Sequence, residues 1–264
     1  MRLAVVTATL LALAFPMRQA SAQEVAREVD LALVLAVDVS LSMDPEEQRV
    51  QRQGYVAAFR SEAVKAAVRQ GLIGRIAVTY VEWAGVGSQY VVVPWTVIGT
   101  AAEAEGFADQ LTPARPRRAI WTSIAAVLDF SVALLRGAGV EATRQVIDVS
   151  GDGPNNQGRE VTQARDDAVA AGIVINGLPL MISGATGPYD IPDLDLYYRD
   201  CVIGGPGAFM VPVRDVAEFA TAIRTKIIRE VADAAFPAPP IIPAEAFSRA
   251  RCAATGRRGG DFDP

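Results

Sequence analysis

Histidine is absent from this chain of 264 residues. Its absence excludes Ser-His-Asp triads, histidine general bases and zinc sites built from imidazole ligands. Lysine is almost absent as well, since only Lys65 and Lys226 occur and arginine supplies the remaining positive charge. The formal net charge is −5, and an acidic chain is a poor partner for the phosphates of nucleic acid.

The chain lacks an apolar run long enough to cross a bilayer, which takes about 20 residues. The longest run, residues 3–15, follows Arg2 and precedes the small residues Ala20-Ser21-Ala22. This order is typical of a cleaved secretory signal, with a retained anchor as the alternative. We therefore predict a signal peptide at residues 1–22, a periplasmic or secreted protein of net charge −7, and no membrane span after cleavage.

Cysteine is scarce, with Cys201 and Cys252 alone. In an exported protein, two cysteines are expected to form one disulfide, and two free thiols are the alternative. A proline-rich stretch begins near residue 236, so we expect one domain over residues 23–235 and a linker and tail over residues 236–264.

The most informative stretch is an unbroken apolar run, residues 31–37, that ends at Asp38. Such a run predicts a strand buried on both faces of a parallel sheet. Ser40 and Ser42 follow at alternate positions, and Asp44-Pro45 begins a helix. Ligands of open α/β sheets bind at the carboxyl ends of the strands. A carboxylate and two hydroxyls at such an end favour Mg²⁺ over zinc.

Strand and helix patterns alternate along the rest of the chain, which predicts an α/β fold. We expect a doubly wound, mainly parallel Rossmann-like sheet with an antiparallel edge strand. The predicted strands are residues 75–83, 89–95, 144–150, 173–180 and 209–213. The predicted helices are residues 45–69, 100–110, 160–171, one that follows Thr122, and a last one capped by Asp215.

Two further polar positions follow in chain order. Thr122 precedes a helix, where it is expected to be either the N-cap or a metal ligand, and Asp152 follows the strand at residues 144–150. Three polar loops should therefore meet at the carboxyl ends of the strands. Asp148 is unusual because it is a carboxylate inside an apolar strand, and a buried carboxylate needs a partner. The sequence does not identify that partner.

The strand–Asp38-x-Ser40-x-Ser42–helix unit, with Thr122 and Asp152-Gly153 later, resembles the metal-ion-dependent adhesion site of von Willebrand factor A domains. The stretches 146–158 and 197–205 resemble an exported bacterial family of such proteins with no assigned function. The resemblance implies direct metal binding by Ser40 and Ser42, and binding by Thr122 directly or through water. Asp38 and Asp152 would act mostly through water.

The metal implied by this resemblance is Mg²⁺, or alternatively Mn²⁺ or Ca²⁺. Its open position would accept a carboxylate from an unknown protein ligand, which makes the chain a binding module rather than an enzyme. Trp83 and Trp121 would flank the site as apolar partner contacts, with core packing as their alternative. The glycines that usually precede the family's threonine are replaced by Ala119-Ile120-Trp121, so the shape of this loop is open.

Two other functions compete with this interpretation. Haloacid-dehalogenase phosphohydrolases also place an aspartate after an apolar strand and a Gly-Asp-Gly later, so Asp38 could be a nucleophile. However, Ser40 stands where that family has its general acid–base, Asn156 stands where it has its last acid, and no lysine lies between Thr122 and Asp152. The other alternative is a metal-free structural domain whose Asp, Ser and Thr residues are only helix caps.

Overall fold

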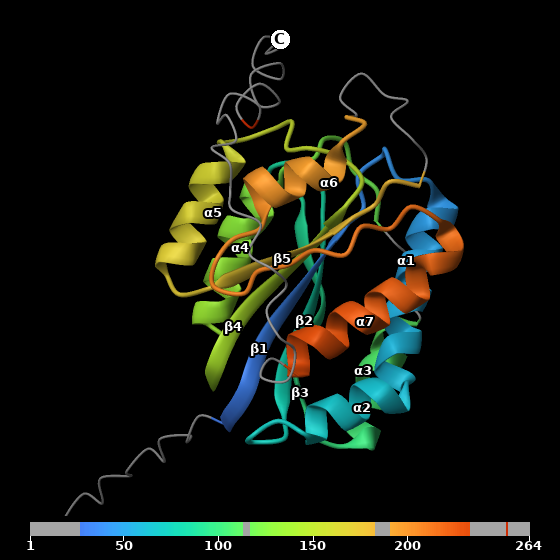
Figure 1. Cartoon of the computed structure of the whole chain (residues 1–264), viewed down its shortest axis with the longest axis vertical. Helices are drawn as coiled ribbons and strands as arrows, with labels where there is room; N and C mark the ends of the chain where they lie inside the picture. Colours follow the sequence, from blue (N-terminus) through green and yellow to red (C-terminus); the bar gives the residue numbers. More distant parts are fainter. Residues whose placement is uncertain (1–26, 113–116, 183–190, 233–251, 253–264) are drawn as a thin grey trace, which may run out of the picture.

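A five-stranded sheet forms the centre of the computed structural model, which describes residues 27–112, 117–182, 191–232 and 252 (Figure 1). The strand order is β3-β2-β1-β4-β5. β1 pairs in parallel with β2 and β4, β4 pairs in parallel with β5, and β2–β3 is antiparallel. The predicted fold class is therefore confirmed. The strands are β1 (Arg27–Asp38), β2 (Ile76–Trp83), β3 (Gln89–Ile98), β4 (Val140–Gly151) and β5 (Val174–Pro179).

β1 is the middle strand, and its apolar run is buried on both faces as predicted. Leu31, Leu33 and Leu35 face one hydrophobic cluster, whereas the intervening Ala32 and Val34 face the other. This alternation follows from the two-residue period of a strand. The apolar run, residues 31–37, is followed directly by Asp38, the last residue of the strand.

Helices cover both faces of the sheet (Figure 1). Residues of four helices pack into the first cluster, and residues of three pack into the second. The first layer contains α1 (Pro45–Arg60), α2 (Glu62–Arg69), α3 (Ala101–Leu111) and α7 (Phe219–Ala232). The second contains α4 (Ile124–Arg136), α5 (Val161–Ala170) and α6 (Leu194–Tyr197), which continues as a π-helix (Tyr198–Val202).

Two predicted elements differ in the structure. The helix expected over residues 45–69 is divided at Ser61, whose extended backbone ends α1 and whose hydroxyl caps α2 by accepting the Val64 N–H at 3.3 Å. The strand expected over residues 209–213 is reduced to isolated bridges from Met210 to Gly177 and from Val213 to Leu180. Pro212 interrupts it, because proline has no N–H to give to a ladder.

The predicted disulfide is present, joining Cys201 in the π-helix to Cys252. Among the described residues, no helix has both the length and the apolar character needed to cross a membrane. The predicted signal peptide and nearly all of the predicted tail lie outside the described residues.

Candidate metal site

The candidate site begins where β1 ends. Asp38 is completely buried, and its Oδ1 accepts the Ser40 N–H at 2.7 Å, which turns the chain back over the strand end. The turn then leads into α1, whose first residues are held by a capping box between Asp44 and Glu47. A capping box satisfies the unpaired N–H groups at a helix start. The backbone between Asp38 and α1 is thus fixed at both ends.

The hydroxyls and the second aspartate form one continuous chain of polar contacts. Ser40 Oγ lies 2.8 Å from Ser42 Oγ, and Ser42 Oγ donates to Asp152 Oδ1 at 2.8 Å. Asp152 comes directly after β4, the neighbour of β1 in the sheet. The structure therefore brings together the side chains from the first and third of the predicted loops.

Thr122 is buried beside the Asp152 loop, but it is not the N-cap of the helix that follows it. Ser123, and not Thr122, is the N-cap of α4, since Ser123 Oγ accepts the Ala126 N–H at 3.3 Å. A side-chain carbon added to Gly153 would lie 3.9 Å from Thr122 Oγ1, which places that hydroxyl against the Asp152 loop. The cap is therefore supplied by the neighbouring serine, and Thr122 Oγ1 does not serve that purpose.

Two asparagines hold the Thr122 and Asp152 loops together. Thr122 N–H donates to Asn156 Oδ1, and Asn156 N–H donates to the Thr122 carbonyl, both at 2.8 Å. Asn155 Oδ1 accepts the Ala125 N–H at 3.0 Å. Sequence reasoning missed this role. The available signal was two consecutive amide side chains directly after a strand-end turn, where such groups commonly bind backbone.

Trp121 adopts a left-handed backbone conformation with φ of 69°. It is the only non-glycine residue with positive φ in the part of the chain that the structure describes. The loop therefore keeps a conformation that glycine adopts freely, although a tryptophan stands there. Strained backbone of this kind clusters at functional sites.

Trp83 does not flank the site as a partner contact. Its side chain is fully buried in the second hydrophobic cluster, so the core-packing alternative is correct. The reason is that β2 pairs with the central strand and is covered on both faces, as all eight of its residues are buried. Trp121 is only partly buried and stays a candidate contact.

The electrostatics of the site favour a cation. Burial raises the pKa of Asp38 well above its usual range and the nearby Asp152 carboxylate raises it further, whereas hydrogen bonding from Ser40 and from the Asp152 backbone opposes the shift. Asp38 Oδ2 is buried without a hydrogen-bond partner among the described residues. A buried carboxylate oxygen that faces a second carboxylate is stabilised when a cation lies close to both.

The donor set suits a hard cation. Within the described residues, no group of three or more His, Cys, Asp or Glu side chains could hold a metal ion. A metal here would therefore depend on the hydroxyls of Ser40, Ser42 and Thr122 together with Asp38 and Asp152. These are all oxygen donors, which Mg²⁺ prefers and which leave room for water ligands. The residues present fit such an ion.

The phosphohydrolase alternative gains no support from the lysines. Lys226 pairs with Asp148 and Glu230, and Lys65 pairs with Glu62 and Glu105. These partners lie outside the site, so neither lysine supplies the positive charge that such an active centre requires.

Comparison with known proteins identifies the family and the fold. Residues 28–235 match the model of a family described as "Protein of unknown function (DUF1194)". No curated protein matches the chain. Several solved structures with the same fold are 12% to 14% identical to it.

One such structure is proximal thread matrix protein 1 from the mussel byssus, with 14% identity, a TM-score of 0.58 and coverage of 78% of this chain and 49% of that one. Another structure of that protein, with a TM-score of 0.55, is described as having a zinc-occupied MIDAS motif. The pilus adhesin SpaC from Lactobacillus rhamnosus GG has 12% identity, a TM-score of 0.56 and coverage of 79% and 30%.

A von Willebrand factor type A structure from Catenulispora acidiphila has 14% identity, a TM-score of 0.52 and coverage of 77% and 43%. The fold is therefore von Willebrand factor A-like. The chain spans about half or less of the length of these proteins.

Proposed function

Because this chain belongs to the DUF1194 family, whose description assigns no activity, we propose its function from its site: an exported, metal-dependent protein-binding module. The observation that carries the proposal is the chain of contacts Ser40–Ser42–Asp152 beside the unpartnered, buried Oδ2 of Asp38. Two segments 110 residues apart in sequence thus bring oxygen donors together, and Thr122 Oγ1 lies close to the Gly153 backbone beside them. Parallel topology brings helix caps to this edge of the sheet, but capping alone does not require hydroxyls and a carboxylate from two loops to contact one another.

In this proposal the residues have separate tasks. Ser40 and Ser42 bind the ion directly, and Thr122 binds it directly or through water. Asp38 and Asp152 orient the hydroxyls and hold water ligands. Few negatively charged groups therefore contact the ion directly. When bound, Mg²⁺ (or Mn²⁺ or Ca²⁺) supplies an electrophilic position that accepts a carboxylate oxygen from a partner.

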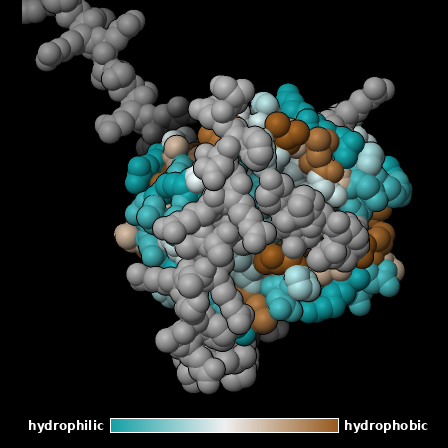
Figure 2. Space-filling model, turned by 90° about the horizontal axis from the view of Figure 1, so that it is seen from above, coloured by the Kyte–Doolittle hydropathy of each residue, from teal (hydrophilic) through white to brown (hydrophobic). Residues whose placement is uncertain are grey.

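The surface around the site suits such a partner. Leu41, Val86 and Ile120 are between 48% and 60% exposed, on three loops that meet at this end of the sheet. Arg117 and Arg118 are exposed next to them. Figure 2 views the molecule from this end and shows brown, hydrophobic patches next to teal, hydrophilic surface. We expect a protein segment with an acidic side chain flanked by aliphatic residues to bind here.

Export is part of the proposal and rests on the predicted signal peptide together with the disulfide. The pilus adhesin SpaC shares the fold, which supports an adhesion-type role outside the cytoplasm. A binding role also accounts for a site without histidine, since no proton transfer by imidazole is needed.

The first test is calorimetric titration of the purified protein with Mg²⁺, Mn²⁺ and Ca²⁺, together with melting in each ion. A site occupied at 100 times its dissociation constant should raise the free energy of unfolding by about 2.7 kcal/mol. Asp38→Ala and Ser42→Ala should lose this gain. Asp109→Ala should keep it, because Asp109 is exposed on α3 and pairs with Arg60.

Equal melting of wild type and Asp38→Ala in every ion would refute the metal site. Hydrolysis of an aryl phosphate is measured in the same buffers. Turnover that Asp38→Asn abolishes would establish the phosphohydrolase instead. Metal binding without turnover supports the binding module.

The partner class is tested with fluorescent peptides that carry one Glu or one Gln between leucines or between serines. Binding should need both the divalent ion and the Glu, and should be tightest with leucines. Ile120→Glu should weaken it by repulsion. Val216→Glu is a suitable control, because Val216 is also an exposed aliphatic residue but precedes α7.

A further inference from the structure

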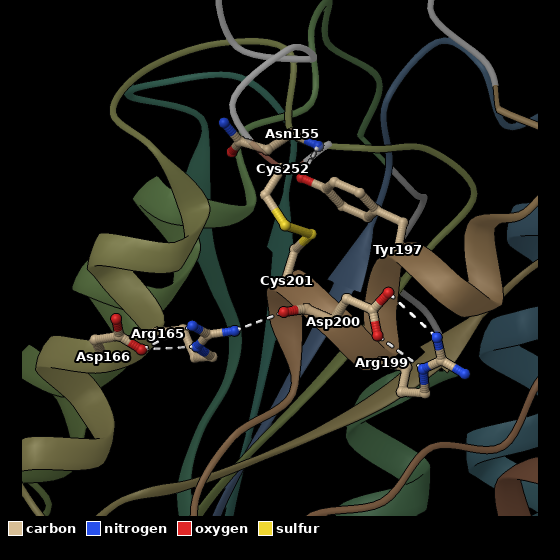
Figure 3. Close-up of a disulfide and its surroundings, with 8 residues drawn as sticks. All are labelled: Asn155, Arg165, Asp166, Tyr197, Arg199, Asp200, Cys201 and Cys252. Carbon is tan, nitrogen blue, oxygen red and sulfur yellow. Dashed lines mark hydrogen bonds and ion pairs between the residues drawn. A yellow bond between two sulfur atoms is a disulfide. The ribbon is translucent and has the colours of Figure 1, made fainter. Parts of the chain in front are cut away.

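Two consecutive tyrosines lie next to the candidate site. Tyr197 ends α6 and Tyr198 begins the π-helix, and both side chains are buried. Tyr197 Oη accepts the N–H of Asn155 at 3.1 Å (Figure 3). This contact ties the first tyrosine to the loop that carries Asp152. Tyr198 Oη, in contrast, has no hydrogen-bond partner among the described residues.

The unpartnered hydroxyl of Tyr198 faces the same space as the unpartnered oxygen of Asp38. A side-chain carbon added to Gly151 would lie 2.8 Å from Asp38 Oδ2 and 3.0 Å from Tyr198 Oη. Both atoms therefore approach Gly151, at the end of β4. Only the absence of a side chain at this glycine leaves room for them.

A second glycine admits the ring of the same tyrosine. A side-chain carbon at Gly177 in β5 would lie 2.8 Å from Tyr198 Cδ1. Such a distance is shorter than carbon atoms tolerate, so the ring occupies the space that a larger residue would need. Glycines on two neighbouring strands thus place the Tyr198 hydroxyl beside Asp38.

The segment that carries the tyrosines is anchored at several points. Cys201 lies in the same π-helix as Tyr198 and forms the disulfide with Cys252, which Figure 3 shows close to Tyr197. Arg165 of α5 donates to the Asp200 carbonyl at 2.9 Å. Gly204 forms an antiparallel bridge to Ile175 of β5. The position of the tyrosines is therefore set by covalent and backbone contacts as well as by packing.

A role in packing alone does not account for the hydroxyl. Burying a hydroxyl without a hydrogen-bond partner is unfavourable, and phenylalanine would fill the same space without that cost. A tyrosine hydroxyl carries its proton at neutral pH, because its ordinary pKa is about 10. The group beside Asp38 is a hydrogen-bond donor.

We propose that Tyr198 is a positioning residue of the metal site, which donates its O–H to Asp38 Oδ2 when the ion is bound, and that the Cys201–Cys252 disulfide holds it in place. The inference rests on the proposed metal site. Hydrogen bonds from outer residues orient the groups that hold a metal, and their loss typically lowers affinity about 10- to 100-fold. Tyr198 would be such an outer residue.

The test compares wild type with Tyr198→Phe by calorimetric titration of Mg²⁺ and Mn²⁺ and by melting without metal. We expect Tyr198→Phe to weaken metal affinity about 10-fold or more, with the metal-free melting temperature unchanged or higher. A structural role would lower the metal-free melting temperature instead. Tyr55→Phe is the matched control, because Tyr55 is equally buried, also lacks a described hydrogen-bond partner, and packs in the other cluster.

Equal affinities of wild type and Tyr198→Phe would overturn the inference and leave the proposed metal site intact. Absence of binding by wild type would remove both.

The disulfide is tested in the same titration with dithiothreitol, which reduces the bond to two thiols and is itself oxidised to a cyclic disulfide. Reduction should weaken metal binding by wild type and should have little further effect on Tyr198→Phe, because effects that act through one group are not additive. The same fold-loss in both proteins would show that the disulfide does not act through Tyr198. Melting in the same buffer verifies that the reduced protein is folded.

Discussion

Lys226 Nζ lies 2.6 Å from Asp148 Oδ1, and only 1% of each side chain is exposed. Lys226 also pairs with Glu230 one turn later on α7, and Asn176 donates to Glu230 at 3.1 Å. Asp148 is the strand carboxylate for which the sequence suggested no partner. Its partner is one of the two lysines of the chain, and the pair connects β4 to the helix that covers it.

Removal of this lysine should destabilise the fold strongly. Lys226→Met leaves Asp148 and Glu230 buried without a cation, and loss of one partner from a buried pair costs about 3–5 kcal/mol. Urea unfolding would measure the loss. Lys65→Met is the matched control and should cost less, because its partners Glu62 and Glu105 are 81% and 43% exposed. A Lys226 variant as stable as the Lys65 variant would contradict this expectation.

Stability should also depend on the protonation of Asp148. Burial and then Glu230 raise the pKa of Asp148 to about 7, and Lys226 opposes the shift. A carboxyl whose pKa is higher in the folded state binds more protons there, so its contribution is complete below its unfolded pKa and is lost as the pH rises.

We therefore expect the free energy of unfolding of wild type to decrease, relative to Asp148→Asn, between about pH 4 and pH 7, with a slope of up to about 1.4 kcal/mol per pH unit. Above that range the difference should be constant. Urea unfolding of both proteins across this range measures the slope. Parallel curves would show that Asp148 titrates as it does in the unfolded chain.

The positive φ of Trp121 leads us to expect an unusual order of stability among variants at this position. Glycine is ordinarily less stabilising than alanine, but at a positive φ the order should reverse. We expect Trp121→Gly to be more stable than Trp121→Ala by about 1 kcal/mol. At the neighbouring Ile120, which has no positive φ, alanine should be the better residue. Thermal unfolding of the four variants measures both orders, and alanine ahead at both positions would argue against strain.

Gly151 should tolerate no side chain. Gly151→Ala places a carbon 2.8 Å from Asp38 Oδ2 and 3.0 Å from Tyr198 Oη, and overpacking of this kind costs about 1–3 kcal/mol. Gly106→Ala on α3 is the control, because nothing lies within 4 Å of its added carbon. The free energy of unfolding of Gly106→Ala should be about 0.5–1 kcal/mol higher than that of wild type. Denaturant unfolding distinguishes the two variants. If Gly151→Ala is as stable as wild type, Asp38 and Tyr198 are not tightly packed against Gly151.

The sequence predicted the central part of the fold because the determining signals are local. The apolar run of β1 marks a strand buried on two faces, and the proline and acidic residues after Asp44 mark a helix start. The convergence of Ser42 and Asp152 followed from parallel topology, since the carboxyl ends of adjacent parallel strands lie at one edge.

What the sequence did not predict depends on contacts between distant residues. The Lys226–Asp148 pair joins α7 to β4, and no local pattern indicates which carboxylate a lysine will meet. The clamp of Asn155 and Asn156 depends on how the Thr122 loop approaches β4. Burial of Trp83 follows from the position of β2 beside the central strand, which periodicity alone does not give.

The hydrogen bond from Ser42 to Asp152 joins residues 110 positions apart. Contacts of such separation form late in folding, because closing a long loop costs entropy before any contact compensates for it. An ion held by both residues would therefore find its ligands assembled only after β1 and β4 have paired. Interactions absent from the folding transition state slow unfolding and leave the folding rate unchanged. The ion would thus lengthen the lifetime of the native protein without helping it to form.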